Sequence, residues 1–205
     1  MILPIDEINR SIPYREYFGI MALTEKQKKY RIAFAERLED ELFLIYMLFS
    51  TLKDYSVTDD KIIVRQLTQA YLDVVSTFAI PQDDYILEIA ALFATDFVRT
   101  TIKHIEEAWY TSQDRVMYNA ENEANTVLNY KDYIDAIGKG YTRKTWITEN
   151  DLRVRDTHIP LEGETIPISD LFVVGNALMR YPKDLEYAAD SPEEIVNCRC
   201  SIKYS

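Results

Sequence analysis

The sequence predicts an α+β protein, in which a region of long helices at the N-terminus precedes a small C-terminal α+β domain with an antiparallel sheet. Three observations lead to this prediction. Apolar residues recur at helical spacing through the first two thirds of the 205-residue chain. The whole chain has 5 glycines, so tight turns are few. After Gly140 the pattern changes to short alternating runs between turn residues, which is typical of strands.

Three helices are expected in the first half of the chain. The first covers residues 24–53, which contain neither Gly nor Pro. The second carries an apolar stripe over residues 63–78 and is stopped by Pro81, because proline cannot continue a helix. The third covers residues 84–110 and keeps an apolar stripe throughout.

A fourth helix is expected over residues 113–137, where Gly138 ends it. Its middle part, residues 118–126, is almost entirely polar or alanine. A helix with such a composition either crosses solvent or packs closely on another element, and the sequence leaves both interpretations open.

Short strands and turns are expected in the last third. Residues 141–148 alternate and are rich in β-branched and aromatic side chains, which favours a strand. Residues 161–168 predict a turn with a short strand on each side, and residues 172–174 form a brief apolar run. Residues 198–204 alternate again and are expected to form a closing strand.

The formal net charge of −11 argues against avid DNA binding by the whole molecule, because binding of the phosphate backbone requires positive charge. One stretch is locally basic. Arg143, Lys144 and Arg153, with Arg155 beside them, are therefore the candidate contacts to nucleic acid. The alternative is a solvated loop whose arginines pair with neighbouring acidic residues. Trp146 is expected to anchor the core of the small domain rather than to stack on a base.

No targeting or membrane segment is expected. Residues 1–7 lack the charged and then apolar pattern of a secretory signal. The longest apolar window, residues 42–48, is too short to cross a bilayer. The sequence also contains no phosphate-binding glycine loop and no His-Glu-x-x-His motif. We therefore expect a chain made in the cytoplasm, without a membrane partner.

Both cysteines of the chain, Cys198 and Cys200, lie in one Cys-Arg-Cys step, and His158 lies forty residues before it. Three interpretations compete. The favoured one is structural, because cysteine behaves as a small buried hydrophobic residue. In that case Asn197 and Arg199 make local hydrogen bonds, and Arg155 or Arg199 clamps Asp151 or Asp156 of the small domain.

The second interpretation is a zinc site, because two sulfurs and an imidazole suit that ion. Its fourth ligand would be Asp156 or a water. The third interpretation is a cysteine nucleophile with His158 as its base, oriented by Asp151 or Asp156. Apart from the possible zinc, no cofactor is expected.

The C-terminal motifs also follow the order and spacing of a known family pattern. The residues that carry it are Gly140, Lys144, Trp146, Asp151, Arg155, His158, Leu161, Gly163, Phe172, Tyr181, Pro182, Asn197, Cys198, Arg199 and Cys200. Over roughly residues 113–203 the chain resembles the phage Mu F-like head morphogenesis family of minor capsid proteins. It departs from the family at Lys183, where many members have glycine, and at residues 175–177, where many have a glycine-rich segment.

The resemblance implies a structural virion protein, not an enzyme, that lies in the capsid interior or at the portal vertex after assembly in the host cytoplasm. Residues 1–112 would bind the portal protein, and residues 113–205 would form the Mu F-like domain. Other head proteins and packaged DNA are the further partners, and the role is in head assembly or in DNA packaging and ejection. The alternative is an enzyme or a zinc-dependent effector domain that uses His158 with Cys198 and Cys200.

Overall fold

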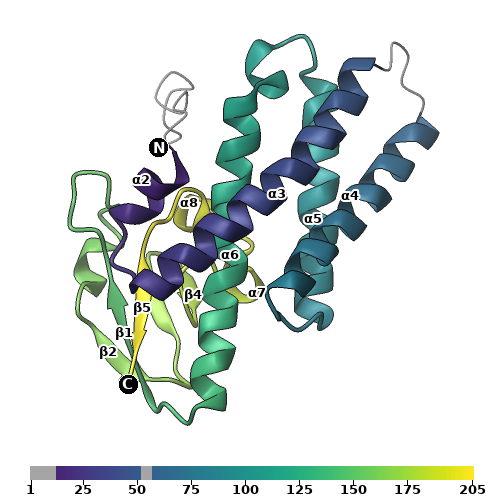
Figure 1. Ribbon diagram of the computed structural model, residues 1–205. Coiled ribbons are helices and arrows are strands. Elements are labelled where there is room, and N and C mark those ends of the chain that lie inside the picture. Colours follow the sequence, from purple (N-terminus) through teal and green to yellow (C-terminus); the bar gives the residue numbers. More distant parts are fainter. Residues whose placement is uncertain (1–12, 52–56) are drawn as a thin grey trace. The chain divides into compact units, whose positions relative to one another are not determined.

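The computed structural model describes residues 13–51 and 57–205 (Figure 1). Residues 1–7, for which no secretory signal was expected, lie outside the described residues. The predicted fold class is confirmed: long helices come first and a small antiparallel sheet follows. The described residues form two compact units. We call residues 33–121 the helical unit, and residues 13–32 with 122–205 the mixed unit.

The helical unit contains α4 (Val57–Thr77), α5 (Asp84–Lys103), the 3-10 helix η1 (Ala108–Thr111) and parts of two longer helices (Figure 1). These longer helices are α3 (Glu25–Thr51) and α6 (Gln113–Gly138), and each begins in one unit and ends in the other. Three of the four predicted helices therefore match closely over the described residues. The end of the first prediction, residues 52–53, lies outside them.

The third helix is shorter than predicted, because it ends at Lys103 instead of Tyr110. Local contacts explain the early end. The ring of His104 stacks on Tyr110 with 4.4 Å between the ring centroids, and its Nδ1 lies 2.6 Å from Oε1 of Glu107. These contacts close a turn that an uninterrupted helix would not allow.

Apolar side chains at helical spacing make the core of the helical unit, as the periodicity predicts. Phe34, Leu38, Leu67 and Tyr71 are fully buried. One charged side chain lies among them: Arg115 donates to Oγ1 of Thr101 at 2.6 Å and covers the ring of Phe97. Burial lowers the pKa of Arg115 to about 10, so the guanidinium stays charged at neutral pH.

The mixed unit begins with α2 (Tyr14–Gly19) and the first two turns of α3. Thr24 and Gln27 form a capping box at the start of α3: Gln27 N donates to Oγ1 of Thr24 at 3.3 Å, and Thr24 N donates to Oε1 of Gln27 at 3.0 Å. This reciprocal pair explains why the helix begins where the sequence predicts.

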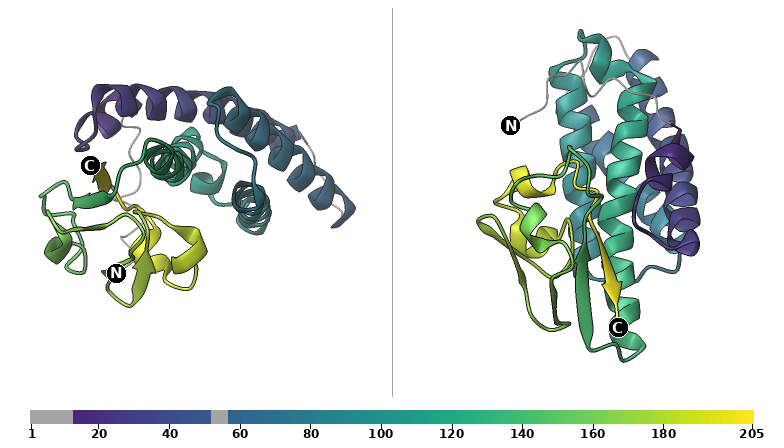
Figure 2. Two further views of the ribbon diagram at one scale, coloured as in Figure 1. Left: turned by 90° about the horizontal axis from the view of Figure 1, so that it is seen from below. Right: turned by 90° about the vertical axis from the view of Figure 1, so that its left-hand side faces the viewer.

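A three-stranded antiparallel sheet in the order β2-β1-β5 forms the main sheet of the mixed unit (Figure 2). Its central strand is β1 (Arg143–Ile147), flanked by β2 (Thr165–Pro167) and β5 (Ser201–Tyr204). Trp146 is paired with Ile202 of β5. The first and last of the predicted strands thus lie side by side.

A second sheet is the hairpin of β3 (Phe172–Val174) and β4 (Ala177–Met179). Its two-residue loop starts at Gly175, which has a φ of +58°, a conformation that glycine adopts without steric cost. Two single-turn helices, α7 (Leu185–Ala188) and α8 (Pro192–Ile195), lead from this hairpin toward β5.

Two strand predictions need correction. The turn at Gly163 has a strand only on its C-terminal side, because a 3-10 helix, η2 (Ile159–Leu161), precedes it. The closing strand begins at Ser201 and not at Cys198. The Cys-Arg-Cys step therefore lies in the loop before β5.

The polar middle of α6 packs closely instead of crossing solvent. Asn125 and Asn129 are buried, and both accept hydrogen bonds from Arg31 of α3, at 3.2 and 2.7 Å. Asn129 also donates to the carbonyl of Pro182. Ala124 on the same helix is fully buried. The polar composition thus reflects a hydrogen-bonded interior within the mixed unit.

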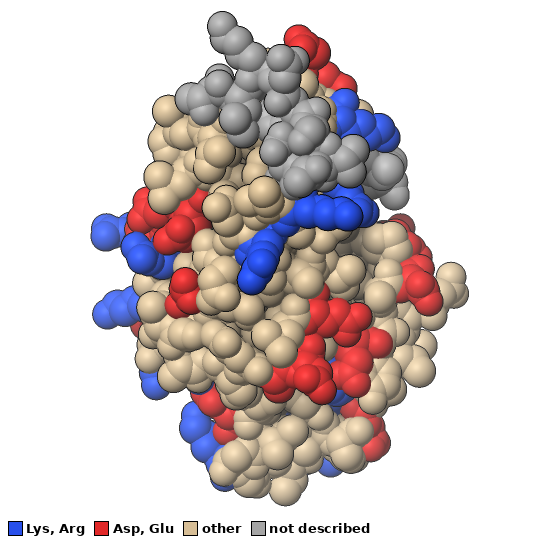
Figure 3. All heavy atoms as spheres, turned by 90° about the vertical axis from the view of Figure 1, so that its right-hand side faces the viewer, with Lys and Arg blue, Asp and Glu red and all other residues tan. Residues whose placement is uncertain are grey.

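Acidic and basic side chains lie in separate small groups on the face drawn in Figure 3, between broad neutral areas. Among the described residues of this face no continuous basic surface is visible. None of the helices described is both long and apolar enough to cross a membrane. The predicted domain boundary between residues 112 and 113 stays a prediction.

Candidate functional site

His158 and the two cysteines are positioned by turns in the loops that carry them. His158 N donates to the carbonyl of Arg155, and Pro160 stands in the first turn of η2, where its missing N–H costs nothing. On the other side, Asn197 has a φ of +60° and Cys198 N donates to the carbonyl of Ile195. Asparagine tolerates this left-handed conformation better than most residues.

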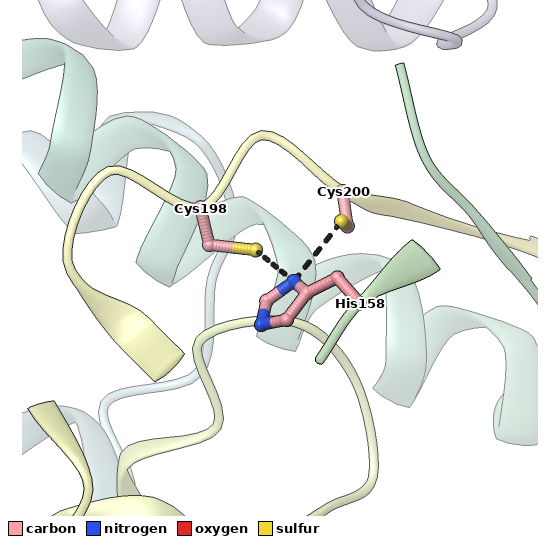
Figure 4. A group of neighbouring side chains, drawn as sticks. All are labelled: His158, Cys198 and Cys200. Carbon is pink, nitrogen blue, oxygen red and sulfur yellow. Dashed lines mark hydrogen bonds between the residues drawn. The ribbon is translucent and has the colours of Figure 1, made fainter. Parts of the chain in front are cut away.

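These turns bring the imidazole beside the two sulfurs, with one ring nitrogen directed at both (Figure 4). Nδ1 of His158 lies 3.4 Å from Sγ of Cys200 and 3.7 Å from Sγ of Cys198. The three ligand atoms all lie within 4.8 Å of one another. All three side chains are buried, with exposed fractions of 1 to 4%. Residues forty positions apart therefore form one compact group.

The other ring nitrogen of His158 is held by a carboxylate that the sequence analysis did not select. Nε2 lies 3.0 Å from Oε2 of Glu194, and the same oxygen accepts from Oγ1 of Thr157 at 2.7 Å. A carboxylate only accepts hydrogen bonds, so Nε2 donates and Nδ1 faces the sulfurs. Asp151 and Asp156, the orienting residues predicted from the sequence, do not take this position.

Gly175 makes room for Glu194. A Cβ at this glycine would lie 2.3 Å from Oε1 of Glu194 and 3.2 Å from Cγ2 of Thr157. No sequence pattern links Gly175 with Glu194, because the fold alone brings the two residues together.

The pKa values of the two thiols are shifted in opposite directions. The hydrogen bond from Cys200 lowers the pKa of the Cys198 thiol well below its usual value, and the same bond raises the pKa of Cys200. Burial disfavours the imidazolium of His158, but the hydrogen bond to Cys198 and the negative charges of Cys198 and Glu194 together raise the pKa of His158. Of the two thiols, Cys198 is therefore the one that loses its proton more readily.

The arginines near the site make separate contacts. Arg199 donates to Oδ1 of Asp151 at 2.7 Å, and this bond lowers the pKa of the Asp151 carboxyl. Arg155 donates to the carbonyl of Val196. The predicted arginine clamp on Asp151 is therefore present and comes from Arg199, while Arg155 fixes the loop just before the first cysteine.

Trp146 anchors the core beside the site, as expected. Its side chain is fully buried, and its ring meets those of Phe172 and His158 edge-on, at centroid distances of 5.1 and 5.8 Å. Gly163, with a φ of +76°, closes the following turn by donating from its N–H to the carbonyl of Trp146. Trp146 thus packs against the ring of His158, and Gly163 holds the backbone of Trp146 in place.

Lys144 requires a correction, because it was predicted to contact nucleic acid and is fully buried. Its Nζ donates to the carbonyl of Arg180 at 2.8 Å and lies 5.3 Å from the centre of the Phe172 ring. Such an ammonium cannot reach a phosphate. Arg143 and Arg153 are exposed, and their contact with nucleic acid stays a prediction.

Tyr181 and Pro182 hold the segment after β4 in place. Tyr181 is fully buried and its ring lies 5.2 Å from that of Tyr133 on α6. The next residue, Lys183, has a φ of +66°. This conformation gives a physical reason why glycine is common here in the family, since glycine adopts it without strain.

A small pocket opens beside the cysteine–histidine group. It is lined by Glu149, Arg153, Val154, Arg155, His158, Asn197, Cys198, Arg199 and Cys200. Chemically, the arrangement can share protons between thiol, imidazole and carboxylate, or it can offer one nitrogen and two sulfur ligands to a metal ion. Asp156, the predicted fourth ligand, is exposed and is not part of the group.

Comparison with known proteins gives one finding. The chain matches the family described as Phage Mu protein F like protein over residues 91–203. Neither the curated proteins nor the solved structures gave a match. The matched segment starts in α5, earlier than the resemblance at residues 113–203, and contains all of its motifs. Because this segment is more than half of the chain, the protein belongs to the Phage Mu protein F-like family, whose members are phage head proteins.

Proposed function

We propose that the protein is a minor head protein that binds the portal vertex inside the capsid and assists head assembly or DNA packaging and ejection. The observation that carries this proposal is the family match over residues 91–203. The family is one of structural head proteins, which favours a structural role over an enzymatic one. The net charge of −11 also fits a protein that is held in place by protein contacts more than by DNA.

We assign the contact with the portal or another head protein to the helical unit. Most of the helical unit lies before the residues that match the family, so the family match does not assign its role. The assignment therefore depends on the surface of this unit. Adjacent residues of α3, Phe43 and Leu44, are 42% and 61% exposed, and Leu92 of α5 is 57% exposed. Single exposed apolar residues are ordinary. The pair on α3 lies on a long helix, where it offers a stable apolar contact to a partner.

The test is co-expression of the full chain with the portal protein of the same phage, followed by size-exclusion chromatography. Co-elution as one complex is expected. Leu44→Glu would place a charge in the contact and weaken co-elution at least tenfold. Ala33→Glu is the matched control, because it adds the same charge at an exposed position of the same helix. The proposal is contradicted if the chain elutes separately from the portal protein and is missing from purified heads.

A second candidate, an enzyme or an effector domain, rests on the geometry of Cys198, His158 and Glu194. A thiolate, an imidazole and an orienting carboxylate are the parts of a cysteine nucleophile. The burial of Cys198, at 2% exposure, argues against it because a substrate must reach the sulfur. Rapid and selective modification of Cys198 by iodoacetamide at neutral pH would favour this candidate, and a slow reaction would exclude it.

A further inference from the structure

The distances around His158 match those between the ligands of a zinc ion. Zinc in a tetrahedral site lies about 2.3 Å from sulfur and about 2.0 to 2.1 Å from nitrogen, which puts a nitrogen and a sulfur ligand about 3.6 Å apart. The two measured separations, from Nδ1 of His158 to the sulfurs of Cys200 and Cys198, are 3.4 and 3.7 Å. Both nitrogen-to-sulfur separations therefore fit ligands of one tetrahedral ion, and the three ligand atoms all lie within 4.8 Å of one another.

The surroundings of His158 are those of a metal ligand. A metal-binding histidine usually donates its second ring N–H to a carboxylate, which fixes the ring and raises its basicity. Nε2 of His158 has this partner in Glu194, at 3.0 Å, and Glu194 is itself buried and held by Thr157. The ring is therefore fixed with Nδ1 directed at both sulfurs.

The charge of the group also suits a divalent cation. Two thiolates balance the charge of one Zn²⁺, so the ion and its two sulfur ligands together would carry no net charge, whereas a buried thiolate without a cation is costly. The buried indole N–H of Trp146 lies toward Cys200 and makes no well-aligned hydrogen bond. A sulfur bound to zinc would give this buried donor an acceptor.

We propose that His158, Cys198 and Cys200 bind one zinc ion, with Glu194 as the positioning residue for His158 and a water from the adjoining pocket as the fourth ligand. The water is assigned because, among the described residues, the group contains no fourth ligand atom. Zinc would tie the loop before η2 to the segment before β5. This proposal is independent of portal binding, since it depends only on the mixed unit.

The first experiment uses the full chain, purified under reducing conditions, stripped of metal and titrated with Co²⁺ and then Zn²⁺. We expect one equivalent of Co²⁺ to produce thiolate-to-cobalt charge-transfer absorption, and one equivalent of Zn²⁺ to displace it. The wild-type chain is sufficient for this test, so it does not depend on the folding of a variant. The absence of charge-transfer absorption, or binding of less than a tenth of an equivalent, overturns the proposal.

Variants then locate the site. Cys198→Ser and Cys200→Ser should each weaken zinc binding by more than 100-fold, and Glu194→Gln by about 10- to 100-fold because it acts through His158. His104→Ala is the matched control for His158→Ala: it removes the other histidine, in the helical unit, and should leave zinc binding unchanged. Equal loss of zinc in both histidine variants contradicts the assignment. Failure of portal co-elution with intact zinc binding would contradict only the proposed function.

Discussion

The helical unit and the mixed unit are stabilised by different kinds of contact. The helical unit packs apolar side chains such as Phe34, Leu67 and Tyr71 at helical spacing. The mixed unit adds to its apolar core many more buried polar side chains, which have specific partners. Its residues Arg31, Lys144 and Asp184 are all at most 1% exposed. Apolar packing tolerates exchange of similar side chains, whereas a buried polar network depends on every member.

The largest expected effect comes from Asp184→Ala in the mixed unit. Asp184 accepts hydrogen bonds from N, Nε and Nη2 of Arg180 and caps α7 through Glu186 N. Burial alone would lower the pKa of Arg180, but the bond to Asp184 raises it, so the arginine stays charged. Removal of the carboxylate leaves that charge without its buried partner and should cost about 3–5 kcal/mol of unfolding free energy.

Each tryptophan reports the unfolding of one unit, because Trp146 lies in the mixed unit and Trp109 in the helical unit. Urea unfolding of Asp184→Ala in a Trp109→Phe background reports the mixed unit through Trp146 fluorescence. The exposed Asp190→Ala should shift the transition by less than about 0.5 kcal/mol. If Asp184→Ala behaves like this control, the polar network does not stabilise the mixed unit and the comparison fails.

A smaller effect is expected in the helical unit from Leu67→Ala. Leu67 is fully buried, so the change leaves a cavity and should cost about 3 kcal/mol. Far-UV circular dichroism and Trp109 fluorescence measure the loss. The same change at Leu92, which is 57% exposed, is the matched control and should cost well under 1 kcal/mol. Coincident loss of the Trp146 signal would mean that the two units unfold as one.

A finer test compares two glycines of the mixed unit. Gly175 and Gly163 both have positive φ values, +58° and +76°, so alanine strains the backbone at either position by about 1 kcal/mol. Only at Gly175 does the new Cβ meet a side chain, at 2.3 Å from Oε1 of Glu194. Movement of that carboxylate breaks its bonds to Thr157 and His158.

Gly175→Ala should therefore cost roughly 1–2 kcal/mol more than Gly163→Ala, because hydrogen bonds to a buried carboxylate are lost in addition to backbone strain. Thermal unfolding with Trp146 fluorescence compares the two variants. The affinity for Co²⁺ should fall in Gly175→Ala and stay unchanged in Gly163→Ala. Equal behaviour of the two variants would show that the close approach of Glu194 has no energetic importance.

The contrast between the units also explains which structural features could be predicted from the sequence and which could not. Helical periodicity located α3, α4 and α6 to within a few residues, because the spacing of buried apolar residues follows directly from the geometry of a helix. The end of α5 was wrong, since a local contact between His104 and Tyr110 stops it. Composition alone could not show that the polar middle of α6 is buried, because its partner Arg31 is 94 residues away from Asn125 in the chain.

The site was predictable in part. The spacing of His158, Cys198 and Cys200 singled out three residues that the fold does bring together. Glu194 was missed, since its pairing with His158 depends on the position of α8. The burial of Lys144 had a signal that was not used: in an alternating strand, Lys144 shares a face with Trp146. The expectation that lysine is solvated outweighed it.

A change of stability with pH tests how tightly the interior of the mixed unit surrounds Lys144. Burial lowers the pKa of Lys144 from the ordinary 10.5 to about 8, so the folded chain releases this proton more readily than the unfolded chain. The destabilisation by the charged form is complete below pH 8. It disappears as the pH rises to 10.5, and stability therefore increases with pH across this range, by at most about 1.4 kcal/mol per pH unit.

Lys144→Met removes the titrating group and keeps an apolar chain between the rings of Tyr133 and Phe172, which the ammonium now faces at 5.5 and 5.3 Å. The unfolding free energy of the wild type, relative to this variant, should rise between pH 8 and 10. Lys139→Met, at an exposed position, should give no such difference. A flat difference for Lys144→Met would mean that water reaches the ammonium in the folded state. The polar interior of the mixed unit would then be more open than its buried side chains indicate.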